Sequence, residues 1–187
     1  MRLSELLYSQ GFGTRRLCAG LIENGLVTVR GEVLSEPATE IDVATSPVDY
    51  TVQGQSWEYQ QRAYVMLSKP AGYECSHRPG AWPSVYTLLP APLRQRPTPG
   101  KVQGVQAVGR LDQDTTGLLL LSDDGAFIHR MNSPRHHVPK VLQAHRVSHK
   151  GAPGHVHRRR GRKAEAGRCR FFHEGGSFPL FRVLHVA

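Results

Sequence analysis

The sequence has few cysteines, no long apolar run and no apolar leader at its first residues. Its three cysteines, Cys18, Cys75 and Cys169, are odd in number and far apart, so they predict no disulfide framework and fit a reducing compartment. No apolar run reaches the length needed to cross a bilayer. The opening residues also lack the apolar stretch of a signal peptide. We therefore expect a soluble, cytoplasmic protein that does not associate with membranes.

The chain is also poor in acidic residues. It has 15 Asp and Glu against 24 Lys and Arg, which gives 187 residues a net charge of +9. Such an excess favours a polyanionic partner, usually nucleic acid. The excess is uneven, because residues 142–187 hold ten Lys and Arg against two acids, while residues 1–141 are nearly balanced. RNA binding in the first three quarters must therefore depend on where individual arginines lie.

Residues 1–34 predict two short helices and a hairpin. Leucines at helical spacing begin the first helix, and the glycines of GFG at 11–13 end it. Thr14 is a candidate N-cap for a second helix that Asn24-Gly25 ends, with an apolar stripe of Leu17, Leu21 and Ile22. Valines then alternate around Arg30-Gly31, which predicts a tight hairpin. A short strand and a linker over 53–62 are expected to follow.

Four arginines decorate this unit, and they allow two interpretations. They are Arg2, Arg15, Arg16 and Arg30. A solvated face explains them about as well as RNA binding does. Arg15 and Arg16 would lie in the first turn of the second helix, where the helix dipole disfavours cations, so a bound phosphate explains them better than stability does. The whole stretch resembles an S4 RNA-binding domain, and the resemblance implies that these arginines face RNA.

The next part of the chain predicts two buried strands separated by a long proline-rich loop. Apolar residues from Tyr64 to Leu67 form the first strand, and turn residues after Lys69 end it. SVYTLLP within the loop predicts a short helix. The leucines at 118–121 predict a strand buried on both faces. Ser122 and Asp123 are candidate N-caps for a helix that Pro134 ends.

Asp112 lies just before the leucine strand, in GRLDQDTTGLLLLSDDG at 109–125. A lone Asp in such a place usually closes an Asx-turn. Arg110, the hydroxyl of Thr115 and the rigid strand behind favour instead an oriented nucleophile or base. Asp114 and Asp112 form a weak D-x-D pattern without a third ligand, so no metal site is expected. Lys69 is included among the candidate RNA contacts, although a surface lysine in a turn explains it slightly better.

Gly109, Arg110, Leu111, Asp112, Thr115, Gly117, Leu118 and Leu119 meet the pattern G-R-L-D-x-x-T-x-G-L-L, which resembles the catalytic signature of pseudouridine synthases. LSKPAGY at 67–73 is similar to that family's first motif, and SPRHH at 133–137 to its small-ribosomal-subunit branch. The resemblance implies isomerisation of a uridine in ribosomal RNA after the base is flipped out. It implies Asp112 as the essential carboxylate, Arg110 as its ion-pair partner or an RNA contact, and no cofactor.

The resemblance ends near residue 141, where the family has a tyrosine two residues after the lysine and this chain has Leu142. Residues 142–187 are basic and rich in histidine, and we expect little regular structure there before the last dozen residues. A shifted reading frame explains the segment best. The alternatives are a natural basic tail or a metal site, whose spacing is not a standard zinc pattern, formed by His155, His157, Cys169 and His173.

The sequence thus predicts an α+β fold. An S4-like domain spans 1–52, a linker spans 53–62, half of a mixed, mostly antiparallel synthase domain spans 63–141, and a tail unlike the family spans 142–187. Strands that should be central would become open edges, so we expect poor solubility, low stability or no turnover. The leading function is a monomeric isomerase acting on ribosomal RNA or a pre-ribosomal particle. The competitors are a non-catalytic RNA-binding protein and, on RRRGRK alone, a DNA-binding protein.

Overall fold

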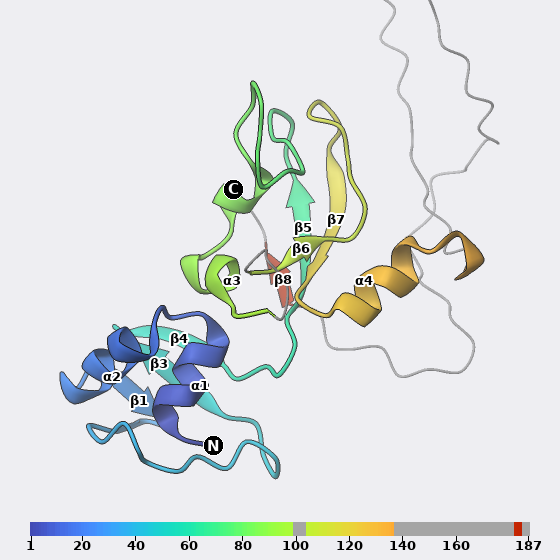
Figure 1. Cartoon of the computed structure of the whole chain (residues 1–187). Coiled ribbons are helices and arrows are strands. Elements are labelled where there is room, and N and C mark those ends of the chain that lie inside the picture. The colour runs from blue at the N-terminus through green and yellow to red at the C-terminus, as the bar shows by residue number, and fades with distance from the viewer. Residues whose placement is uncertain (99–103, 137–181, 185–187) are drawn as a thin grey trace, which may run out of the picture.

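The structure is a computed structural model that describes residues 1–98, 104–136 and 182–184. The chain forms two modules, each built on a four-stranded sheet (Figure 1). The first module comprises residues 1–58. The second comprises residues 63–136 together with 182–184. Among the described residues, no helix has both the length and the apolar character needed to cross a membrane.

The first module packs two helices on an antiparallel sheet of order β2-β1-β3-β4. Its elements are α1 (Leu3–Gln10), α2 (Arg15–Glu23), β1 (Val27–Val29), β2 (Glu32–Val33), β3 (Asp49–Val52) and β4 (Gln55–Glu58). Thr14 caps α2 as predicted, because its side chain accepts a hydrogen bond from the N–H of Leu17. The predicted apolar stripe is wrong at one position: Ile22 is fully buried, but Leu17 is 54% exposed.

Two hairpins in this module have the same kind of turn. Arg30-Gly31 and Gln53-Gly54 both have positive φ angles, of 50° and 88° and of 51° and 78°. Turns with two positive φ angles match the twist of paired strands. The first hairpin was predicted from the alternating valines. The second was not, because QSWE has a single apolar residue, so the linker predicted over 53–62 is wrong in its first half: β4 pairs with β3 along its whole length.

The second module has a sheet of order β6-β7-β5-β8, in which only the pairing of β5 with β8 is parallel among the described strands. Its elements are β5 (Tyr64–Lys69), η1 (Val85–Leu88), α3 (Ala91–Gln95), β6 (Gln106–Ala107), β7 (Gly117–Ser122), α4 (Gly125–Asn132), η2 (Pro134–His136) and β8 (Arg182–Leu184). The mixed, mostly antiparallel α+β fold is confirmed. β8 lies in the segment that the sequence had placed outside this domain, and it joins the sheet beside β5.

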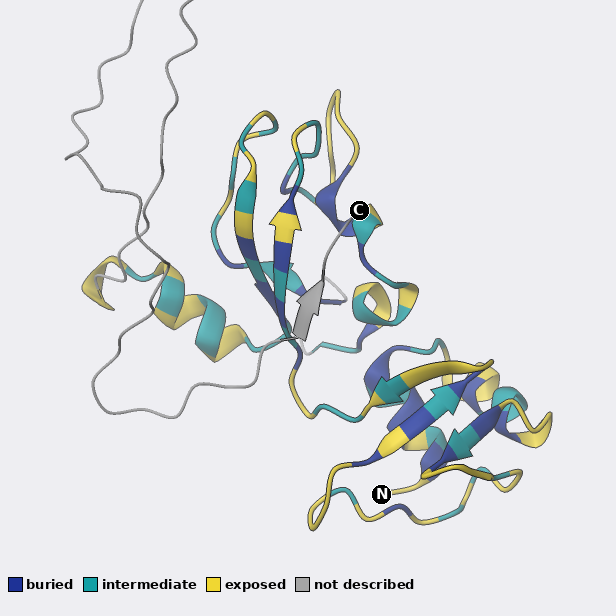
Figure 2. Ribbon diagram, turned by 180° about the vertical axis from the view of Figure 1, so that it is seen from behind, coloured by how far each residue is buried: buried dark blue, intermediate teal, exposed yellow. Residues whose placement is uncertain are grey.

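Burial along β7 corrects a second expectation. Leu119 and Leu121 are buried, whereas Leu118 is 42% exposed, so one face of this strand is covered rather than both. Figure 2 shows buried and exposed positions alternating along the strands. The covered face packs against a cluster that includes Val65, Leu67 and Val85.

The helix after β7 begins one residue later than predicted. Asp124, not Ser122 or Asp123, caps α4, because its carboxylate accepts hydrogen bonds from the N–H groups of Ala126 and Phe127. The hydroxyl of Tyr64 donates to the same carboxylate at 2.7 Å. This hydrogen bond, followed by those from the two N–H groups, lowers the pKa of Asp124. Asp123 does not cap the helix, and its carboxylate accepts hydrogen bonds from Ala63 and Arg96 instead.

Several expectations fall on residues outside the described part of the chain. They concern Leu142 in place of a tyrosine, the histidine-rich and basic character of the tail, and the metal ligands proposed at His155, His157, Cys169 and His173.

Candidate functional site

Asp112 lies in the loop that leads into β7, and its side chain is exposed. The loop after β5, residues 70–84, projects from the same end of the sheet, opposite the end that faces the first module (Figure 1). The two loops are joined directly, because the N–H of Gly72 donates to the carbonyl of Gln113 at 2.7 Å. Antiparallel pairing of β5 with β7 brings them together, since it sets Lys69 opposite Gly117.

The Asp112 loop is held from inside by Lys69. This lysine is 1% exposed, and its Nζ donates to a cage of four backbone carbonyls, those of Pro70, Asp112, Gln113 and Thr115, at 2.7 to 3.2 Å. An ammonium group has three N–H donors, so one of them is shared between two acceptors. Lys69 therefore fixes the backbone of the loop that carries the candidate carboxylate.

This burial corrects the sequence-based assignment of Lys69 as an RNA contact or a surface lysine. A side chain with 1% exposure and all its donors directed at carbonyls cannot reach a phosphate. The reason is tertiary, because the four carbonyls belong to two loops that meet only after β5 and β7 pair. Lys69 positions Asp112 rather than substrate.

The side chain of Asp112 does not close the turn in which it lies. The turn is closed by backbone groups, since the N–H of Thr115 donates to the carbonyl of Asp112 at 3.1 Å. Among the described residues, the carboxylate of Asp112 has no hydrogen-bond or ion-pair partner, and Arg110 does not pair with it. Within that same part of the chain, no group of His, Cys, Asp and Glu side chains is placed to bind a metal, so Asp114 joins no such cluster.

The loop over residues 70–84, which lies beside the Asp112 loop, is ordered by the carboxylate of Glu74. The carboxylate of Glu74 accepts hydrogen bonds from the N–H groups of Gly80 and Trp82, at 3.0 and 3.1 Å, and these bonds lower the pKa of Glu74. Arg110 adds a smaller, coulombic lowering of the same pKa. The indole of Trp82 is 47% exposed and lies against Gly72. An exposed tryptophan is thus held next to the Asp112 loop.

The four arginines of the first module are all exposed, but they do not form one group. Arg15 and Arg16 line a cleft of about 530 Å³ with Tyr8 and Thr14, and the guanidinium of Arg15 lies 4.4 Å above the ring of Tyr8. Residues of the second module close the other side of this cleft, namely Gln95 and Pro97. Arg30 instead donates to Ser46, and Arg2 lies near Glu40, so neither lines this cleft.

A larger cleft, of about 740 Å³, lies at the junction of the modules, between β3, β4, β5 and α3. Asp112 lines neither of these two clefts. Asp112 is instead an exposed residue of the loop that leads into β7.

Three residues of interest were not identified from the sequence. Glu74 and Trp82 lie in a proline-rich loop without a periodic pattern, and Arg96 follows a helix, α3, that was not predicted. The one usable signal in the sequence is Trp82, an aromatic residue that lies among turn-forming residues. The partners of Arg96 are up to 86 residues away in the sequence, so no local pattern marks it.

Known proteins match both modules. The family described as RNA pseudouridylate synthase matches residues 63–178, and the S4 domain matches residues 1–45. The first match continues past residue 141, and this corrects the expectation that the resemblance ends there.

Two curated relatives agree with these families. The uncharacterized RNA pseudouridine synthase YtzG of Bacillus subtilis is 35% identical over 146 residues, which cover 78% of this chain and 57% of the relative. The ribosomal small subunit pseudouridine synthase A of Escherichia coli K12 is 38% identical over 142 residues, 75% of this chain and 57% of the relative. This chain thus spans little more than half the length of these relatives.

Among solved structures, a pseudouridylate synthase is 29% identical and aligns over 73% of this chain and 54% of its own, with a TM-score of 0.33. The motif around Asp112, the S4 match and the synthase match over most of the second module agree. The chain belongs to the RNA pseudouridylate synthase family.

Proposed function

We propose that this chain binds folded ribosomal RNA and converts a uridine to pseudouridine, with Asp112 as the essential carboxylate. The observation that carries the proposal is the contrast between the side chain and the backbone of this residue. The carboxylate is exposed and makes no hydrogen bond or ion pair with another described residue, while Lys69 and Gly72 hold the backbone of its loop. A side chain that served only the turn would have a partner in the turn.

The reaction breaks the bond from N1 of uracil to C1′ of ribose and forms a bond from C5 to C1′. The proton on C5 is released to solvent, N1 gains a proton, and there is no net oxidation or reduction. The carboxylate of Asp112 can act either as a nucleophile toward the ribose or the uracil ring, or as a base that removes a sugar proton. Both courses require the uridine to leave its stack, because no side chain reaches these atoms inside a helix.

RNA would be bound by residues of both modules. Arg15 and Arg16 offer guanidinium groups to the phosphate backbone, which supplies affinity without sequence information. Arg110 provides a cation close to Asp112. Trp82 offers an aromatic face on which an unpaired base can stack, since base stacking on exposed aromatic rings is a common mode of single-strand recognition.

The small ribosomal subunit is the proposed source of the RNA, because the Escherichia coli relative is named for it. The competing function is RNA binding without catalysis. It is favoured by one observation, namely that Asp112 lines neither of the two clefts described above.

Tritium release distinguishes the two functions. Small-subunit RNA transcribed with uridine labelled at C5 loses tritium to water when the new bond forms at C5. We expect release by the native chain, and a loss of at least about 10³-fold for Asp112→Asn, as is found when an essential side chain is removed. RNA affinity should be unchanged, and stability should change by less than about 0.5 kcal/mol, because Asp112 is exposed.

Asp114→Asn is the matched control, since Asp114 is an exposed carboxylate two residues further along the same turn. It should release tritium at the native rate. Full release by Asp112→Asn would end the catalytic assignment. Binding without release by the native chain would favour the non-catalytic alternative.

A further inference from the structure

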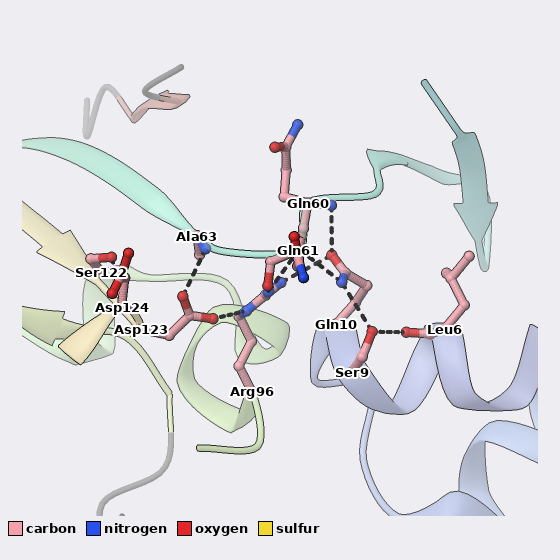
Figure 3. A network of polar contacts seen from close by, with 10 residues as sticks. All are labelled: Leu6, Ser9, Gln10, Gln60, Gln61, Ala63, Arg96, Ser122, Asp123 and Asp124. Carbon is pink, nitrogen blue, oxygen red and sulfur yellow. Dashed lines mark hydrogen bonds and ion pairs between the residues drawn. The ribbon is translucent and has the colours of Figure 1, made fainter. Parts of the chain in front are cut away.

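Arg96 is a buried arginine at the junction of the two modules. It directly follows α3 and is 4% exposed. Its guanidinium donates to one carboxylate, one amide and two backbone carbonyls (Figure 3). The acceptors are Asp123 at 2.6 Å, Gln10 at 2.9 Å, Gln60 at 2.8 Å and Gln61 at 3.2 Å. A planar guanidinium with five N–H donors can satisfy such a set in one geometry, and a lysine cannot.

These partners come from three separate parts of the chain. Gln10 ends α1 of the first module, Gln60 and Gln61 belong to the connecting segment, and Asp123 follows β7 of the second module. Gln10 and Gln60 also bond to each other twice, because the side chain of Gln10 donates to the carbonyl and accepts from the N–H of Gln60. The N–H of Ala63 donates to the other oxygen of Asp123 at 2.8 Å. The connecting segment is therefore held at both ends.

The helices on the two sides also make close contact. Gly11, with a φ of 91°, follows α1, and a Cβ placed there would lie 2.1 Å from the carbonyl oxygen of Pro92 in α3. Such a distance excludes any side chain without a backbone shift. Direct backbone contact beside the Arg96 network indicates a fixed junction rather than two modules on a tether.

The junction lies between the two parts of the proposed RNA site. On one side, Gln95 and Pro97 flank Arg96 in the sequence and close the cleft that contains Arg15 and Arg16. On the other side, Asp123 directly follows β7, and the Asp112 loop enters the opposite end of this strand. A strand rises about 3.3 Å per residue, so the six residues of β7 separate the junction from the Asp112 loop by about 20 Å.

We infer that Arg96 is a positioning residue that sets the distance between the RNA held by the first module and the carboxylate of Asp112. It thereby selects which uridine, counted from the bound RNA helix, reaches the site. The inference rests on the proposed function, because it assigns the first module to RNA and Asp112 to the uridine. Arg96 itself need not touch RNA.

The first test does not depend on catalysis. The bond after Arg62, an exposed residue of the connecting segment, is a trypsin site, and cleavage there requires local opening. Cleavage tracks the population of the open form. In the full chain, Arg96→Gln should therefore raise the cleavage rate after Arg62 about tenfold or more. Arg94→Gln, a change at an exposed arginine two residues earlier in α3, should leave the rate unchanged.

The second test measures selection. Hairpins of small-subunit RNA carry a single C5-labelled uridine at successive distances from the stem, and both affinity and tritium release are measured for each. The native chain should prefer one spacing. Arg96→Gln should lose that preference by about tenfold, while its affinity for the stem alone stays the same, because the arginines that bind the stem are intact.

Gln10→Ala removes only the first-module partner, and it should give the same loss of preference if Arg96→Gln does not fold. Unchanged cleavage after Arg62, or an unchanged spacing profile in a folded variant, overturns the inference. Absence of tritium release from every hairpin would instead refute the proposed function, and the cleavage rates and the affinity profile would still decide the role of Arg96.

Discussion

At the scale of single residues, two buried cations, Lys69 and Arg96, hold separate segments of the chain together. Lys69 is surrounded by carbonyl oxygens and by no carboxylate among the described residues, whereas Arg96 forms an ion pair with Asp123 at 2.6 Å. Neither side chain is exposed. The N–H groups of each side chain donate to acceptors in segments that are distant in the sequence. Each side chain therefore joins parts of the chain and is not available to bind a ligand.

Replacing Lys69 should loosen the Asp112 loop. Lys69→Met removes the donor shared by four carbonyls. Those of Asp112 and Gln113 keep a backbone N–H donor, whereas those of Pro70 and Thr115 lose the donor that Lys69 supplies. We expect a loss of about 3 kcal/mol in the free energy of unfolding, since each unsatisfied buried group costs roughly 1–3 kcal/mol. Urea denaturation measures the loss. Amide exchange should also become faster at Gly72 and Thr115 than in Ser68→Ala, a change at an exposed neighbour in β5. Native exchange rates in Lys69→Met would show that the cage does not hold the loop.

At the scale of elements, the loop over residues 70–84 contains no helix or strand, and specific contacts hold it in place. Glu74 holds Gly80 and Trp82 through their N–H groups, and Gly72 is bonded to the Asp112 loop. Tyr86, buried in η1, stacks on His77 of the same loop, with ring centroids 3.8 Å apart. The loop is therefore anchored at several points. The hydrogen bond from the backbone N–H of Trp82 to Glu74 fixes the position from which the exposed indole projects.

Removing the indole should weaken RNA binding without unfolding the chain. Trp82→Ala removes one stacking surface, and such a loss costs roughly 1–3 kcal/mol of binding free energy, or a rise in Kd of about 5- to 150-fold. Trp82→Phe should recover most of the affinity. Glu74→Ala should give an intermediate loss, because it frees the loop and leaves the indole in place. Fluorescence anisotropy with labelled small-subunit RNA measures all three, and equal affinities for Trp82→Ala and the native chain would remove Trp82 from the RNA site.

At the scale of the whole molecule, the proposed RNA surface crosses from one module to the other. The cleft that contains Arg15 and Arg16 is closed by Gln95 and Pro97, and the Arg96 network lies beside it. The net charge of +9 is concentrated after residue 141, so these two arginines are a small part of the total charge. Their effect on RNA affinity must come from their position at the start of α2.

The salt dependence of binding tests that position. If each arginine neutralises one phosphate, Arg15→Gln together with Arg16→Gln should lower the slope of log K against log salt concentration by about 2. Arg135→Gln, at an exposed arginine of η2, serves as the control and should leave the slope nearly unchanged. A native slope in the double variant would mean that the N-terminus of α2 does not contact RNA.

The sequence alone was sufficient for features that depend on neighbouring residues. Leucine spacing predicted α1 and α2, Arg30-Gly31 predicted its hairpin, and the motif around Asp112 indicated the family that the comparisons then showed. The sequence was not sufficient to predict the burial of polar side chains, because the local pattern around a polar residue is the same whether it is buried or exposed. The sequence predicts Lys69 as an RNA contact or a surface residue, and it places Gln55–Glu58 in a linker because that stretch is polar; its strand character comes from pairing with β3.

Only the tertiary structure decided what surrounds the candidate carboxylate. The carbonyls that hold Lys69 lie up to 46 residues away in the sequence, and the partner that Arg96 finds in Gln10 is 86 residues away. Local propensity carries no information about such pairs, because they form only when the two sheets and the junction between them are in place. The candidate catalytic carboxylate is thus visible in the sequence, whereas the residues that hold its loop and the junction of the modules are identified only in the folded chain.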